Sequence, residues 1–272
     1  MKKKNVVRVG IVLGGAILLL FILLGGSSVN AAEYESALNR IQRTQIIRFG
    51  WALWFPWNSV DQKTNKVVGI GPDVVEEMAK ALGNVKIEFV ADSWGTLAGG
   101  LQAGKFDLIY PFGSTLKRAL AVDFTDDTMR ESQNFLIRKK DSAKFKTVED
   151  VNRPGVKVGA SLGTNTEYEL TRLYKNPEII RYKSIAEGFM SLSLGKIDVV
   201  ANTGSGCADA VRQYPDLMVI KGHFALAKNC MAVRQGDQIF LNWLNLFIAD
   251  MKETKTLDRI FQKYGIKREV FF

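Results

Sequence analysis

The stretch Leu-Gln-Ala-Gly-Lys-Phe-Asp-Leu-Ile at residues 101–109 is echoed by Leu-Ser-Leu-Gly-Lys-Ile-Asp-Val-Val at residues 192–200. Each copy predicts a helix that ends at a glycine, a short turn with Lys-x-Asp, and an apolar strand that is buried on both faces. An irregular segment follows each strand, at Pro111–Gly113 in the first copy and Asn202–Gly204 in the second. The repetition therefore predicts two related lobes built from similar supersecondary units.

Short β-branched runs alternate with amphipathic segments along the rest of the chain. A helix is predicted over residues 72–82, where Val74, Val75 and Met78 fall on one face and Gly83 provides the stop. Strand, helix and strand in succession predict an α/β fold with parallel sheets. The expected strands are residues 46–49, 85–90, 106–110, 156–159, 179–182, 197–201 and 217–220, and the last helices are expected at about 237–253 and 256–264.

Two extended segments with charged ends, residues 134–139 and 230–234, are candidate crossings between the lobes. Two crossings would return the last helices to the first lobe and would permit hinge closure around a bound solute. We therefore predict a first lobe of residues 32–137 plus 235–272 and a second lobe of residues 138–234. Ligands of open α/β sheets bind beyond the carboxyl ends of the strands, so both post-strand segments are expected to face a site between the lobes.

The N-terminal residues have the layout of a secretory signal peptide. Three lysines and an arginine within residues 2–8 precede an apolar run over residues 9–24, and small residues follow as far as Ala31. The run is short for a membrane span of roughly 20 residues. We expect residues 1–31 to be a cleaved signal peptide and the mature protein to be periplasmic, with an uncleaved membrane anchor as the alternative.

Charge, histidine and cysteine content limit the partners that we expect. The leader carries four of the 37 Lys and Arg residues and none of the 28 Asp and Glu residues, which leaves a net charge of +5. These charges are scattered rather than clustered with aromatic residues, so no nucleic-acid partner is expected. With His223 as the one histidine, neither a metal site nor a cofactor is expected. Cys207 and Cys230 would lie in an oxidising compartment, and the sequence leaves open whether they form a disulfide.

Nearly the whole mature chain, from about Ile46 to Tyr264, resembles bacterial solute-binding protein family 3, the type II periplasmic binding proteins of the polar amino acid class. The motifs that carry the resemblance are residues 56–57, 69–74, Trp94, residues 114–118, 122–125, 163–165 and 195–198. The resemblance implies a two-lobed fold in which two mixed or parallel sheets are joined by a two-strand hinge. It also implies a monomeric binding component that delivers an amino acid or related small carboxylate to the membrane permease of an ABC importer.

The resemblance further implies where the ligand binds. Arg118 stands where the family places its carboxylate-binding arginine, and a planar guanidinium can donate two parallel hydrogen bonds to a carboxylate. The hydroxyl of Thr164 and the amides that begin a helix there would meet the same carboxylate from the other lobe. Trp54 matches the family's stacking position, and Trp57 and Trp94 are assigned to packing. The candidate ligand-binding residues are Trp51, Trp54, Pro111, Gly113, Arg118, Ser161, Thr164, Asn165 and Thr203.

Thr203 departs from the family pattern, which usually has an aspartate at this position to pair with the α-ammonium of the ligand. An unpaired buried ammonium is costly. Either another acceptor replaces the aspartate, or carbonyls and water hold the ammonium, or the ligand has no primary ammonium.

Residues 145–165 are similar to the cyclohexadienyl dehydratase branch, which shares the binding-protein fold, so a lyase is an alternative function. In that branch a glutamate three residues beyond the aspartate is the general acid, and here the position is Gly206. Because an elimination needs a placed proton donor, we predict a binding protein with no catalytic residues. A ligand-sensing receptor component is a third alternative.

Overall fold

Both copies of the repeated stretch form the predicted helix, glycine turn and strand in the computed structural model, which describes residues 35–266. Gly104 and Gly195 close the two helices with φ angles of +69° and +74°, a conformation that suits glycine. The elements of the two copies are α4 (Leu97–Gln102) with β5 (Leu108–Gly113) and α6 (Ile185–Ser193) with β10 (Val199–Thr203). The predicted repeat is thus confirmed, with each strand beginning two residues later than expected.

Helices and strands alternate over most of the remaining chain, as the sequence predicts. In chain order they are α2 (Ala37–Thr44), β1 (Ile46–Trp51), β2 (Ser59–Val60), β3 (Val67–Val68), α3 (Ile70–Ala81), β4 (Lys86–Ala91), η1 (Arg118–Leu120), β6 (Val122–Phe124), β7 (Met129–Arg138), η2 (Lys139–Asp141), η3 (Val148–Val151), β8 (Lys157–Ser161), α5 (Asn165–Leu173), β9 (Glu178–Tyr182), α7 (Gly204–Gln213), β11 (Leu217–Val219), β12 (Ala225–Arg234), α8 (Gln238–Glu253) and α9 (Thr256–Lys263). Successive strands occur at β2 and β3, β6 and β7, and β11 and β12. Val74, Val75 and Met78 of α3 are fully buried, which confirms the predicted apolar face.

The main sheet has the strand order β4-β1-β5-β12-β7-β10-β8-β9, with β6 paired to β12 and β11 paired to β7. β1 is parallel to β4 and β5, and β8 is parallel to β9 and β10, as the strand and helix alternation predicts. The strands in the middle are antiparallel to their neighbours. The predicted α/β fold class is therefore confirmed, and the sheet is mixed because β7 and β12 add antiparallel pairs to the parallel ones.

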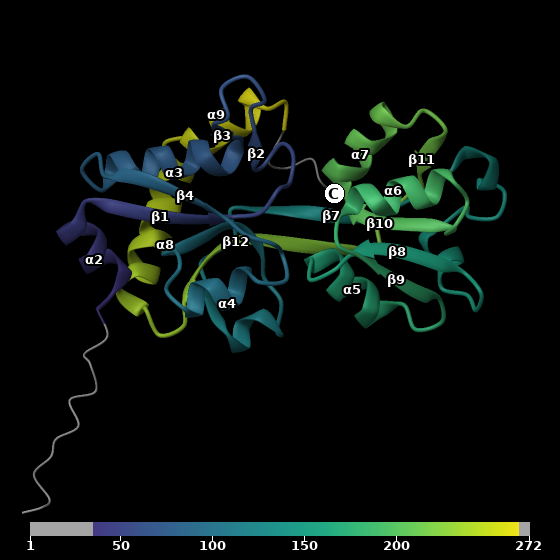
Figure 1. The fold of residues 1–272 in the computed structure, drawn as a ribbon, viewed down its shortest axis with the longest axis horizontal. Helices are drawn as coiled ribbons and strands as arrows, with labels where there is room; N and C mark the ends of the chain where they lie inside the picture. The colour runs from purple at the N-terminus through teal and green to yellow at the C-terminus, as the bar shows by residue number, and fades with distance from the viewer. Residues whose placement is uncertain (1–34, 267–272) are drawn as a thin grey trace, which may run out of the picture. The chain divides into compact units, whose positions relative to one another are not determined.

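β7 and β12 connect two groups of elements (Figure 1). The buried apolar residues form separate clusters in the two groups. They pair with each other over Met129–Gln133 and Ala225–Asn229. Beyond this stretch β12 pairs with β5 and β6, whereas β7 pairs with β10 and β11. We call the group with β1, β4 and β5 the first lobe and the group with β8, β9 and β10 the second lobe. The boundaries at 134–139 and 230–234 remain predictions.

The last helices pack on the first lobe, where α9 lies against α3, and α8 lies against α2 and β12 (Figure 1). Phe261 of α9 lies edge-on against Trp57, with the ring centroids 5.5 Å apart. The predicted signal peptide lies outside the described residues. Within residues 35–266, no helix is both long enough and apolar enough to span a membrane.

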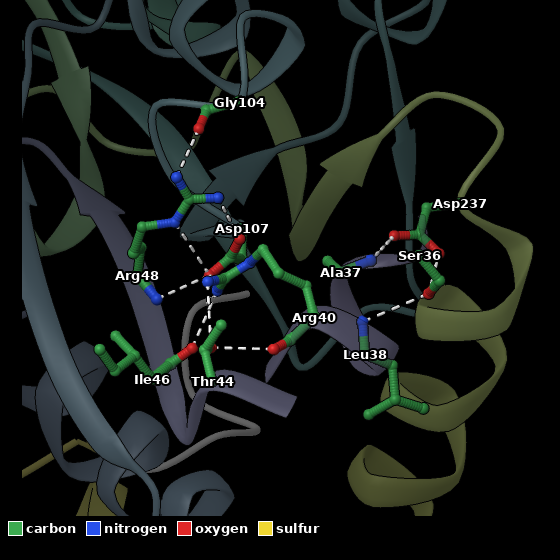
Figure 2. A network of polar contacts seen from close by, with 10 residues as sticks. All are labelled: Ser36, Ala37, Leu38, Arg40, Thr44, Ile46, Arg48, Gly104, Asp107 and Asp237. Atoms are coloured by element: carbon green, nitrogen blue, oxygen red, sulfur yellow. Dashed lines mark hydrogen bonds and ion pairs between the residues drawn. The ribbon is translucent and has the colours of Figure 1, made fainter. Parts of the chain in front are cut away.

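The aspartate of each repeat fastens its strand to the neighbouring parallel strand. The Asp107 amide donates to the Arg48 carbonyl (2.9 Å) and its carboxylate accepts from the Arg48 amide (2.7 Å). Asp198 makes the same pair of bonds with Lys157, both at 3.0 Å. Asp107 also binds the guanidinium groups of Arg40 and Arg48, as Figure 2 shows, and its side chain is 2% exposed. Asp198 pairs with Lys144 at 3.1 Å and is 24% exposed, so the two equivalent contacts differ in burial.

The two aspartates should therefore contribute unequally to stability. Asp107→Asn will lower the free energy of unfolding by about 3 kcal/mol, because it leaves two partly buried guanidinium groups without their carboxylate. Asp198→Asn, the matched control, will cost about 1 kcal/mol or less because its ion pair is solvated. Urea unfolding monitored by circular dichroism measures both values. Equal losses in the two variants would contradict the assignment of Asp107 as a buried fastening point.

Candidate functional site

Arg118 lies just beyond the carboxyl end of β5 and reaches from the first lobe to the second. Its Nη1 donates to the Gly113 carbonyl at 2.6 Å and its Nη2 donates to the Gly163 carbonyl at 2.8 Å. The guanidinium carbon lies 3.7 Å from the centroid of the Phe112 ring. The Thr115 hydroxyl accepts a hydrogen bond from the Arg118 amide at 3.1 Å and so fixes the backbone at this point.

The charge of Arg118 has no acidic partner within the described part of the chain. The side chain is half-buried, and no carboxylate of residues 35–266 forms an ion pair with it. Burial lowers the pKa of Arg118 to about 9, so the guanidinium remains a cation at neutral pH. A guanidinium has five N–H donors, and the two carbonyls leave donors free for an anionic ligand.

The start of α5 faces Arg118 from the second lobe. Thr164 is the N-cap of this helix, where its hydroxyl accepts from the Glu167 amide at 3.2 Å and donates to the Ser161 carbonyl at 2.7 Å. Gly163, just before the cap, has a φ angle of +76°. Helix N-termini favour anions, because their first amides lack partners within the helix. The predicted residues Gly113, Arg118, Ser161, Thr164 and Asn165 are thus brought together.

Two glycines allow the lobes to touch at this place. A Cβ atom on Gly163 would lie 2.8 Å from the Cα atom of Gly95, and a Cβ atom on Gly113 would lie 2.8 Å from the Cβ atom of Asn165. Real Cβ atoms do not approach so closely, so a larger residue at either position would have to push the backbone or Asn165 away. The contact between Arg118 and Gly163 therefore depends on both glycines.

The predicted aromatic residues separate into two groups. Trp54 is partly exposed and lies between Trp57 and Trp94, with ring centroids 5.2 and 5.9 Å away. Trp57 is fully buried, which confirms its assignment to packing. Trp51 is 7% exposed and belongs to the core of the first lobe. Of the two tryptophans predicted to contact ligand, Trp54 has the more accessible ring, and that role stays a prediction for both.

Pro111 and Thr203 occupy structural positions whose ligand contacts stay predictions. Pro111 is buried within β5. Thr203 ends β10 and is the N-cap of α7, where its hydroxyl accepts from the Gly206 amide at 3.1 Å. The hydroxyl of Thr203 also lies 3.3 Å from that of Ser205.

Glu131 of β7 is a candidate that the sequence analysis missed. Its side chain is fully buried, and its Oε1 accepts hydrogen bonds from the Ser205 amide (3.0 Å) and the Ser205 hydroxyl. Its Oε2 has no hydrogen-bond partner within residues 35–266. Burial raises the pKa of Glu131 to about 7. No sequence pattern indicates this site, because a glutamate in a strand is normally exposed and the packing of α7 and β12 around β7 buries it.

The candidate disulfide is not formed, and both thiols are free and buried. Cys207 lies in the core of the second lobe, where its sulfur is 3.9 Å from the Asn134 carbonyl. Cys230 lies on β12, opposite Phe112 of the first lobe. The two residues thus belong to different packing environments. Burial raises the pKa of Cys230 to about 11 and also raises that of Cys207, so neither thiol ionises at neutral pH.

Comparisons with known proteins agree with this architecture. Residues 47–267 match the model of the bacterial extracellular solute-binding proteins, family 3. A Neisseria gonorrhoeae protein named "Probable histidine-binding protein" is 30% identical over 89% of this chain and 90% of its own length. An ancestral amino-acid-binding protein, a precursor of cyclohexadienyl dehydratase, is 30% identical with a TM-score of 0.77, covering 84% of this chain and 99% of its own. A Wolinella succinogenes structure complexed with lysine is 28% identical with a TM-score of 0.75, covering 83% and 98%.

Proposed function

The chain belongs to family 3 of the bacterial extracellular solute-binding proteins, and we propose that it binds an α-amino acid between its lobes and delivers it to the permease of an ABC importer. The observation that carries the proposal is Arg118, a half-buried cation that contacts both lobes and has no acidic partner among residues 35–266. A ligand carboxylate is the partner that such a guanidinium fits best.

Ligand binding from both lobes would favour the closed state of the protein, and this matters for transport. A ligand held by Arg118 from the first lobe and by the start of α5 from the second interacts fully only when the lobes meet. Such a ligand shifts the population toward the closed state by its differential affinity for that state. A permease that recognises the closed state then receives loaded protein. In this account the leader of residues 1–31 is cleaved, the mature protein is a periplasmic monomer, and the lobes are divided at 134–139 and 230–234.

The relatives support an amino acid as the ligand. The names of the three proteins compared above refer to histidine, lysine or amino-acid binding. The partly exposed ring of Trp54 adds a surface that can pack against an apolar side chain or attract a cationic one. We therefore place the α-carboxylate at Arg118 and the start of α5, and the ligand side chain toward Trp54.

A dehydratase activity on the same fold is the second candidate, and the resemblance to the cyclohexadienyl dehydratase branch is the observation that favours it. The ancestral precursor of that enzyme is itself an amino-acid-binding protein, which makes the resemblance compatible with binding alone. Gly206 stands at the position of the general acid. Purified protein incubated with prephenate or arogenate is expected to form no product, and product measured by absorbance would overturn the binding-only assignment.

A thermal-shift screen tests the proposed function. Compounds that carry both a carboxylate and an α-ammonium will raise the melting temperature, and a ligand at 100 times its dissociation constant stabilises by about 2.7 kcal/mol. The panel contains L-lysine, L-arginine, L-histidine and L-cystine together with betaines, aromatic acids and the corresponding amines that lack a carboxylate. Stabilisation by the amines alone would contradict a site built around Arg118.

A further inference from the structure

We propose that Glu131 binds the ammonium group of the ligand and thereby replaces the aspartate that is missing at position 203. The inference rests on the proposed function and adds to it the residue that selects ligands with a primary ammonium. It resolves the question that Thr203 raises in the sequence in favour of a replacement acceptor.

The register of the strands places Glu131 beside the residues that hold Arg118. Asn229 of β12 lies opposite Gly113 on one side and opposite Met129 on the other, and Ala227 lies opposite Glu131. Side chains alternate along a strand, so Met129, Glu131 and Gln133 share one face of β7. Met129 lies in the same row across the sheet as Asn229 and Gly113, and Glu131 is the next residue after Met129 on this face of β7. The carbonyl of Gly113 is one of the acceptors of Arg118.

The start of α5 contacts that region on both sides of Glu131. Asn165 lies against Gly113, and the Thr166 hydroxyl donates to Gln133 Oε1 at 2.5 Å. Gln133 is the next residue on the same face of β7 after Glu131. Ser205, at the start of α7, donates to Glu131 through its amide and its hydroxyl. Glu131 thus lies where the first turns of α5 and α7 meet β7, close to the residues that would bind the carboxylate.

The unpaired polar atoms in this region have a shared explanation. Glu131 Oε2 and Asn229 Nδ2 have no hydrogen-bond partner among the described residues, and their side chains belong to residues that are 0% and 3% exposed. Asn165 Oδ1 is a third such atom. A buried polar atom without a partner costs free energy. The ammonium of an α-amino acid would donate to Glu131 Oε2 and Asn165 Oδ1. Its carboxylate would accept from Asn229 Nδ2.

No cation of the described chain competes for Glu131. It forms no ion pair within residues 35–266, and Arg130 and Lys228, its neighbours on β7 and β12, alternate onto the opposite face. Cys207 of α7 is the titratable group that interacts with it, and this thiol is kept neutral by burial. Glu167 of α5 is engaged with Arg181 at 2.8 Å. The positive end of α7 and the hydroxyls of Ser205 and Thr203 stabilise the ionised carboxylate only in part, because burial still raises its pKa. An ammonium is the partner that would complete its charge balance.

If Glu131 binds the ammonium group, the affinity for ligand will depend on pH. The pKa of Glu131 is about 7, so below this pH the carboxyl must lose its proton before it can pair with an ammonium. The dissociation constant will therefore rise about tenfold for each pH unit below about 7 and will be constant above it. A carboxyl group with the ordinary pKa of about 4.3 would leave affinity constant from pH 5 to 8.

Titration calorimetry with wild-type protein, Glu131→Gln and the control Glu169→Gln, which removes a carboxylate from the second turn of α5, tests the proposal. The probes are L-lysine, L-arginine and L-histidine, each beside its analogue that lacks the α-amino group. Glu131→Gln is expected to weaken binding of the amino acids by about a hundredfold, as for a truncated buried charge pair, and to remove the pH dependence. The affinity of the deaminated analogues will change less than threefold, and Glu169→Gln will bind like wild type.

Two results would overturn the proposal while leaving the proposed function intact: a wild-type affinity that is constant between pH 5 and 8, or a Glu131→Gln variant that keeps the wild-type affinity. The pH profile needs no variant, so the test does not depend on how Glu131→Gln folds. The proposed function fails separately, if wild-type protein binds none of the amino acids at any pH.

Discussion

Arg118→Ala will weaken ligand binding by at least about a hundredfold, a loss of about 3 kcal/mol that is typical when one partner of a desolvated, hydrogen-bonded charge pair is removed. Arg118 donates to the carbonyls of Gly113 and Gly163, one in each lobe, and offers its remaining N–H groups to a carboxylate. The substitution removes the ligand contact and the bridge between lobes together. Titration calorimetry with the best ligand of the thermal-shift screen measures the effect.

Lys117→Ala is the matched control, because it removes one positive charge from the adjacent, exposed position. It is expected to bind like wild type, whereas Arg118→Lys will bind with intermediate affinity, since an ammonium cannot donate two parallel hydrogen bonds. An Arg118→Ala variant that is folded and binds with unchanged affinity would show that the carboxylate lies elsewhere.

Gly163→Ala will weaken binding by about thirtyfold, which corresponds to about 2 kcal/mol of overpacking strain in the state where the lobes touch. The new methyl group would lie 2.8 Å from the Cα atom of Gly95, and the backbone that presents the Gly163 carbonyl to Arg118 would have to shift. The variant raises the free energy of the contacting arrangement, so a smaller fraction of the protein is competent to hold ligand from both sides.

Gly195→Ala is a control that separates the effect of the contact between Gly163 and Gly95 from the effect of backbone strain. Gly195 has nearly the same φ angle, +74° against +76° for Gly163, but a Cβ atom there meets nothing within 4 Å. Both variants should therefore lose similar stability from the left-handed backbone, and Gly163→Ala alone should lose affinity. Equal affinities, measured by calorimetry, would contradict a role for the Gly163 and Gly95 contact in ligand binding.

The parts of the fold that depend on local pattern could be predicted from the sequence. The repeated glycine and Lys-x-Asp turns predicted where β5 and β10 begin to within two residues. The helical spacing of apolar residues predicted the buried face of α3. The antiparallel arrangement of β7 and β12 could not be read from the same pattern. It depends on which edge of each parallel sheet these strands join, and that is a property of the whole chain.

The same distinction holds for the site. Arg118 was predicted because it stands where the family places an arginine. Thr164 was predicted because it follows a glycine at the start of a helix, a pattern that is visible in the sequence. Glu131 was missed, because its burial results from α7 and β12 packing around β7 rather than from its neighbours in the chain. The sequence also left open whether Cys207 and Cys230 form a disulfide, and both thiols are free. Disulfide formation depends on the distance between the two residues, which no sequence pattern supplies.

In the proposed binding mode, one ligand is held through its carboxylate by Arg118 and through its ammonium by Glu131. The most direct measurement is calorimetric titration of wild-type protein with an amino acid found in the screen, with the amine that lacks its carboxylate and with the acid that lacks its ammonium. This binding mode predicts that each truncated compound binds at least about a hundredfold more weakly than the amino acid, as expected when a buried charged group loses its partner. Binding of either truncated compound with the affinity of the intact amino acid would contradict it.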